Sequence, residues 1–178
     1  MKYFQTFLVM ILPFFLGFCS SIEVIPEPTL EQYTVKSEPV CPTWNWHPFC
    51  LNSKPNSVNL YGVLNNTSGE KKYFLDYYLD SFDTDIPVGI SLKLNNAYYV
   101  LRKTHTDYTD AIKIRSELGE DLVKAISENQ SDLVLSYSSR VDTINLEFSK
   151  RQSENFRSSM LDVVKQIESL EKMKIIKK

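Results

Sequence analysis

Short runs in which apolar and polar residues alternate occupy the middle of the chain, and they restrict it to a fold built from antiparallel strands. Such alternation gives a strand one buried face and one exposed face. The runs come in pairs separated by turn-forming residues, as at Asn95-Asn96, which is typical of a two-residue hairpin turn. The predicted hairpins comprise residues 58–64 with 72–79, 88–94 with 97–102, and 132–137 with 141–148.

One helix is predicted between the second and third hairpins. Residues 117–128 carry an apolar stripe at helical spacing, with Ser116 as the expected N-cap. The stripe consists of Leu118, Leu122, Val123 and Ile126. We therefore expect a mainly β protein: an antiparallel β-sandwich-like domain with one inserted helix and a C-terminal amphipathic helix.

The C-terminal segment 153–178 has the pattern of a long amphipathic helix that ends in a basic tail. Its apolar residues recur at steps of four and three along one stripe: Phe156, Met160, Val163, Ile167 and Leu170. Ser153 is the expected N-cap. Two interpretations remain open, since the stripe either docks on the chain's own sheet or binds a partner protein. Residues 172–178 hold four lysines and no acid, which suits an anionic lipid surface or a solvated end.

The N-terminal residues 1–21 have the pattern of a secretory signal peptide. Lys2 precedes an uncharged apolar run at 7–16, and small or polar residues follow it. The run is shorter than the roughly 20 residues that span a bilayer, which favours a cleaved signal over a retained anchor. Its end resembles a lipobox in which Cys19 carries the lipid, and cleavage after Ser21 is the alternative. We expect a periplasmic protein, anchored to the outer membrane if Cys19 is lipidated.

Residues 22–40 lack periodicity and contain three prolines, so we expect an extended tether there. The β domain is expected over 41–152 and begins with a loop bounded by Cys41 and Cys50. In an exported chain this pair predicts a disulfide, and the alternative is a metal site completed by His47. The loop carries three aromatic residues that either form a ligand-contact platform or pack back onto the sheet: Trp44, Trp46 and Phe49.

Charge and motif content argue against several functions. The chain has 20 Lys and Arg against 22 Asp and Glu, so it has no positive field for binding nucleic acid. It lacks the Gly-x-Ser-x-Gly and His-Glu-x-x-His motifs and any phosphate-binding glycine loop. His105 is expected in a solvated loop. An acidic cluster at Asp76, Asp80, Asp83 and Asp85 lacks the glycine and glutamate of an EF-hand. We expect no enzyme activity, no cofactor and no bound metal.

Four segments follow one another in a familiar order: IPVGISLKL at 86–94, DLVKAI at 121–126, LVLSY at 133–137 and INLEFS at 144–149. Their order, a proline-glycine strand entry, a short helix and two closing strands, resembles the invasion-associated locus B family of exported bacterial proteins. The chain lacks the cysteine pair that this family usually places before the helix, and residues 148–160 also depart from its pattern. The resemblance implies a non-enzymatic, virulence-associated β-sandwich in the periplasm or at the surface.

Together these features predict an exported envelope protein that acts as a non-enzymatic interaction or accessory protein. Its β domain and C-terminal helix are expected to contact another envelope protein. The alternative is a small-ligand or carbohydrate-binding module that uses the aromatic loop at 44–49.

Overall fold

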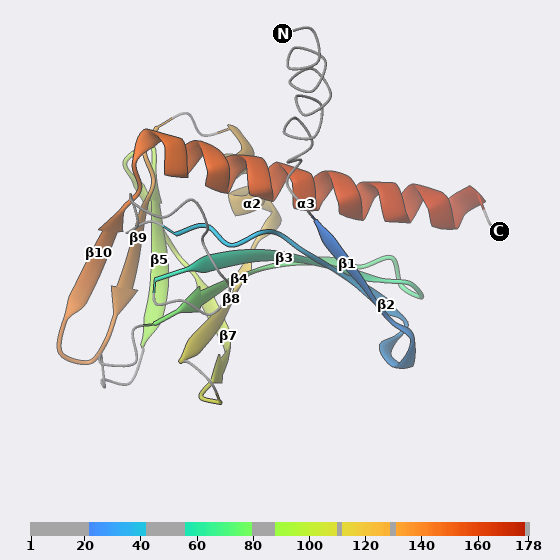
Figure 1. Ribbon diagram of the computed structural model, residues 1–178, viewed down its shortest axis with the longest axis horizontal. Coiled ribbons are helices and arrows are strands. Elements are labelled where there is room, and N and C mark those ends of the chain that lie inside the picture. The colour runs from blue at the N-terminus through green and yellow to red at the C-terminus, as the bar shows by residue number, and fades with distance from the viewer. Residues whose placement is uncertain (1–21, 42–55, 80–87, 110–111, 129–130, 177–178) are drawn as a thin grey trace, which may run out of the picture.

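The computed structural model of the protein describes residues 22–41, 56–79, 88–109, 112–128 and 131–176 (Figure 1). Within these ranges the chain is mainly antiparallel β, with a six-stranded sheet, a four-stranded sheet and two α-helices. The predicted fold class is therefore confirmed, with one short helix in mid-chain and one long helix near the C-terminus.

The larger sheet has six antiparallel strands in the order β1-β2-β3-β4-β8-β7. Their bounds are β1 (Glu23–Glu27), β2 (Gln32–Lys36), β3 (Val58–Asn65), β4 (Lys71–Tyr78), β8 (Lys113–Leu118) and β7 (Arg102–Asp107). The alternation predicted for residues 58–64 and 72–79 appears as the central pair β3 and β4, in which Leu60 lies opposite Leu75.

The smaller sheet has the order β10-β9-β5-β6 and contains the other two predicted hairpins. Its strands are β10 (Thr143–Glu147), β9 (Val134–Ser138), β5 (Gly89–Leu94) and β6 (Ala97–Val100). Asn95 and Asn96 both adopt positive φ, 47° and 65°, as a two-residue turn requires and as asparagine tolerates. Only Leu101 separates β6 from β7, so one extended stretch joins the two sheets.

Helix α3 (Lys150–Ile176) lies along one face of the six-stranded sheet, mainly over β3, and α2 (Glu120–Glu128) packs beside it (Figure 1). Gly62 of β3 allows the close approach. A Cβ atom at that position would lie 2.7 Å from Cγ1 of Ile167 and 2.9 Å from Cγ1 of Val163. Because real Cβ atoms do not come this close, any side chain at position 62 forces the Ile167 and Val163 side chains or the helix itself to shift.

The predicted tether at 22–40 is wrong, because most of it forms the β1–β2 hairpin. Val35 has no exposed surface and lies opposite Gly62 in the sheet. The prolines that suggested an extended linker occupy positions where no ladder hydrogen bond is lost. Pro26 lies on the edge strand β1, and Pro28 begins a short 3₁₀ turn between β1 and β2.

The predicted positions of two helix starts and of His105 also need correction. Ser116 lies in β8 rather than at a helix N-cap, because α2 begins only at Glu120. Helix α3 begins at Lys150, and its capping residue is Ser149 rather than Ser153. The Ser149 backbone N–H donates to Oε1 of Gln152 at 2.7 Å, and the Gln152 N–H donates to Oγ of Ser149 at 3.4 Å, the reciprocal pattern of a capping box. His105 lies on β7, not in a loop.

Candidate interaction surfaces

The apolar stripe of the C-terminal helix is used inside the chain. Phe156, Met160, Val163 and Ile167 have no exposed surface, and Leu170 is partly buried against the same core. The Phe156 ring packs edge-on against the ring of Phe148, with centroids 5.8 Å apart. Of the two interpretations of this helix, docking on its own sheet is therefore the observed one. A partner has no access to the four buried side chains while α3 stays in place.

The N-terminal turn of α3 also holds neighbouring segments. Ser153 is buried, and its hydroxyl oxygen accepts a hydrogen bond from the Leu133 backbone N–H at 3.1 Å. The Gln152 side chain donates to the carbonyl of Cys41 at 2.9 Å. The helix thus fixes both the entry to β9 and the start of the cysteine-bounded loop.

Cys41 is disulfide-bonded. Its pairing with Cys50 stays a prediction, because Cys50 lies outside the described residues. The same holds for Cys19, for His47 and for the loop aromatics Trp44, Trp46 and Phe49. The described part of the chain contains no helix that is both long enough and apolar enough to cross a membrane.

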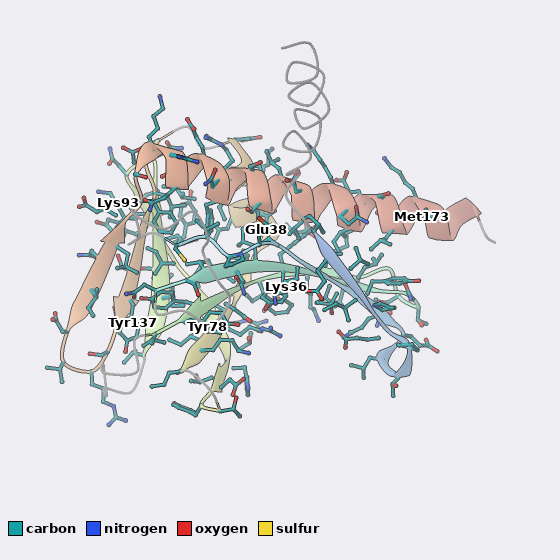
Figure 2. The ribbon with its side chains drawn as sticks, viewed as in Figure 1. Lys36, Glu38, Tyr78, Lys93, Tyr137 and Met173 are labelled. Carbon is teal, nitrogen blue, oxygen red and sulfur yellow. The ribbon has the colours of Figure 1, made fainter. Side chains whose placement is uncertain are left out.

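The far end of α3 carries the first residues of the predicted basic tail. Lys172 and Met173 are exposed, and Figure 2 shows Met173 near the C-terminal end of the helix. Residues 177–178 lie outside the described part.

An ion pair between a buried carboxylate and a partly exposed guanidinium lies on the face of the six-stranded sheet that points away from α3. Asp76 has no exposed surface, and its two carboxylate oxygens accept hydrogen bonds from Nε and Nη2 of Arg115 at 2.7 and 2.8 Å. The guanidinium also lies 4.8 Å from the centroid of the Tyr61 ring. Hydrogen bonding to Asp76 raises the pKa of Arg115, and burial is the main cause that raises the pKa of Tyr61.

This pairing changes the interpretation of the acidic cluster. Both oxygens of Asp76 are engaged by Arg115, and Asp80, Asp83 and Asp85 lie outside the described residues. Among the residues that the structure describes, no three His, Cys, Asp or Glu side chains are arranged to hold a metal ion.

Two further ion pairs lie on this face. Lys113 lies 3.1 Å from Asp107, and Arg102 pairs with Glu117. Hydrogen bonds from Thr109 lower the pKa of Asp107 to about 2. Tyr78 and Lys36 lie on the same side, away from α3 (Figure 2). The three ion pairs Asp76–Arg115, Asp107–Lys113 and Glu117–Arg102 join neighbouring strands of the sheet on this face.

Several large apolar side chains of the four-stranded sheet are exposed. Tyr98 and Val100 on β6 are 66% and 84% exposed, and Val141 in the β9–β10 turn is 80% exposed. Val88 beside β5 and Ile144 on β10 are exposed as well, but the register places Ile144 on the opposite face of the sheet from Tyr98 and Val100. We call Tyr98 and Val100, which share one face of β6, the apolar set of the four-stranded sheet.

The apolar set was not predicted from sequence, although the composition of β6 gave an indication of it. Residues 97–100 are uncharged on both faces of the strand, with Tyr98 and Val100 on one face and Ala97 and Tyr99 on the other. A strand that is apolar on both faces is usually taken as central in a sheet. At a sheet edge, the same pattern leaves apolar side chains in contact with water.

No protein-family model matches the chain, and no curated protein or solved structure matches it. The fold and its surfaces are therefore the grounds on which a function can be inferred.

Proposed function

We propose that the protein is an exported, non-enzymatic interaction protein of the bacterial envelope, and that its four-stranded sheet contacts a partner protein. The apolar set of this sheet is the observation that supports the proposal. Tyr98 and Val100 lie together on one face of an uncharged edge strand, and such an edge pairs readily with another chain. In this proposal α3 packs against the six-stranded sheet, and its apolar stripe makes no contact with the partner. This differs from the expectation from sequence.

Two further features support export. The first 21 residues have the pattern of a signal peptide, and Cys41 is disulfide-bonded, which suits an oxidising compartment such as the periplasm. In the proposal Cys19 carries a lipid that anchors the domain to the outer membrane. The resemblance to the invasion-associated locus B family agrees with this role, because three of its four matching segments belong to neighbouring strands of the four-stranded sheet.

The test compares two exposed tyrosines. Tyr98 and Tyr108 are exposed to almost the same extent, 66% and 63%, but Tyr108 follows β7 of the other sheet. Full-length protein and its Tyr98→Ser and Tyr108→Ser variants are used to capture partners from envelope fractions. We expect the native protein and Tyr108→Ser to capture a specific partner, and Tyr98→Ser to lose it. Equal capture by both variants contradicts a contact through the four-stranded sheet.

A further inference from the structure

The described strands leave four sheet edges, and three of them carry features that discourage pairing with another strand. Natural edges are protected by charges, proline or bulges. Strand β1 has Pro26 and two glutamates, and β10 ends in Glu147. Strand β7 has four charged or histidine residues and a register shift between Lys103 and His105.

Strand β6 is the exception among these edges, because Ala97–Val100 contains no charge, no proline and no register shift. Its side chains toward solvent are those of Tyr98 and Val100, the most exposed apolar residues of the strand. An edge of this kind is open to the addition of another strand.

The backbone of β6 is oriented for such an addition. In a two-residue hairpin the residues that flank the turn form a hydrogen-bonded pair, and such pairs then alternate along the ladder. Tyr99 therefore bonds to Leu92 of β5, and the Leu101 N–H bonds to the Ile90 carbonyl at 2.9 Å, in keeping with this alternation. The N–H and C=O groups of Tyr98 and Val100 consequently point away from β5.

A hollow of about 560 Å³ adjoins this edge. Its lining includes Tyr99 and Val100 of β6 and Leu122 of α2. Three charged side chains also line the hollow: Arg102, Glu117 and Asp121. Arg102 pairs with Glu117, so the charge left over is the carboxylate of Asp121.

We propose that β6 and α2 form a groove that binds an extended peptide segment of the partner, antiparallel to β6, as a fifth strand of the four-stranded sheet. An apolar side chain of the segment enters the hollow between Tyr99 and Leu122, and a basic side chain lies beside Asp121. The proposal rests on the proposed function, since it names the partner chemistry for the same sheet.

The size of the edge decides between a peptide and a second copy of the chain. A stable dimer needs roughly 800 Å² on each partner, which a four-residue edge does not supply. A short peptide needs only a few backbone hydrogen bonds and one or two side-chain pockets. The net negative charge of the hollow also favours a basic segment over a second copy of this edge, whose strand carries no charge.

The experiment uses the peptide TVTKTV-amide, labelled with fluorescein at its N-terminal amine, and two N-methylated forms of it. In the antiparallel arrangement, residues opposite Tyr98 and Val100 exchange hydrogen bonds with them and share their face of the sheet. The threonines take these positions, whereas the valines and the lysine face the hollow. We expect N-methylation of the threonines to weaken binding by about tenfold or more, and N-methylation of the other residues to leave it nearly unchanged.

Two substitutions at one position provide the matched test on the protein. Val100→Pro removes an outward N–H without removing a bond to β5, and an edge strand tolerates proline there. Val100→Thr keeps the shape and the N–H. We expect Val100→Pro to bind the peptide about tenfold more weakly than Val100→Thr. Circular dichroism and thermal unfolding of both variants verify that the fold is kept.

Two results overturn the groove. One is the absence of peptide binding to the native protein up to about 1 mM, and the other is equal affinity of all three peptides. Neither result touches the partner capture that depends on Tyr98, so failure of the groove is distinguishable from failure of the proposed function. If Tyr98→Ser loses the partner but binds the unmethylated peptide with the affinity of the native protein, the partner contacts another part of the same sheet.

Discussion

At the scale of single residues, Gly62 sets the distance between α3 and the six-stranded sheet. We expect Gly62→Ala to lower the free energy of unfolding by about 1–3 kcal/mol, because the added methyl group overlaps Ile167 and Val163. Gly89→Ala is the matched control, since a Cβ there meets nothing within 4 Å. Its expected effect is within about 0.5 kcal/mol. Equal midpoints of urea denaturation for the two variants would contradict the close approach.

Tyr73 links the same helix interface to pH. Burial, assisted by the carboxylates of Glu168, Glu120 and Glu171, raises the pKa of Tyr73 to about 12. In the unfolded chain this phenol titrates near its ordinary value of about 10. Between these two values unfolding releases the proton, so the free energy of unfolding falls as the pH rises.

Tyr73→Phe should therefore make stability less sensitive to pH between about 10 and 12, with Tyr61 supplying the alkaline sensitivity that remains. The measurement is the free energy of urea unfolding at several pH values from about 9 to 12. A variant with the same slope as the native protein would show that Tyr73 is not buried against α3.

At the scale of elements, α3 belongs to the core of the fold. Truncation of the fully buried Met160 to alanine should lower the free energy of unfolding by about 2–5 kcal/mol. Lys165→Ala, at an exposed position of the same helix, should change it by less than about 0.5 kcal/mol. Thermal or urea unfolding of both variants measures the difference. If the two variants unfold alike, α3 is not docked in solution.

The elements that could be predicted from sequence are those in which one face is consistently apolar. This holds for three hairpins and for both helices. Strand β7 could not be predicted, because it lies at an edge with most side chains in water and so carries no alternation. In β8 the core-facing residues are Ile114, Ser116 and Leu118, and the serine interrupts the apolar pattern. The prolines of the β1–β2 hairpin concealed a strand pair that an edge position accommodates.

The candidate site was less predictable than the fold. The spacing of Phe156 and Met160 correctly predicted an apolar helix face, but periodicity does not say whether the cover is the chain's own sheet or a partner. For Tyr98 and Val100, the sequence shows the residue type but does not show that the side chains are exposed. Their apolar character is visible in the sequence, whereas the edge position that exposes them depends on how distant strands pair.

At the scale of the whole molecule, the proposed function implies a folded domain that is exported and attached to a membrane through Cys19. If Cys19 is the lipidated residue, Cys19→Ser should abolish lipid attachment, because the thiol is the acceptor, and should release processed protein from the membrane fraction. Mass spectrometry of the mature N-terminus measures this together with fractionation. A native protein that begins at Ile22 without lipid mass would contradict the anchor while leaving export intact.

The central claim is that the partner contacts the four-stranded sheet and not α3. The most direct measurement is photo-crosslinking in intact cells, with p-benzoylphenylalanine in place of Val100 or, as the control, in place of Lys165. Both positions are exposed, one on β6 and the other on α3. We predict a discrete covalent adduct from position 100 and none from position 165. Adducts from position 165 alone would contradict this claim and would identify α3 as the contact surface.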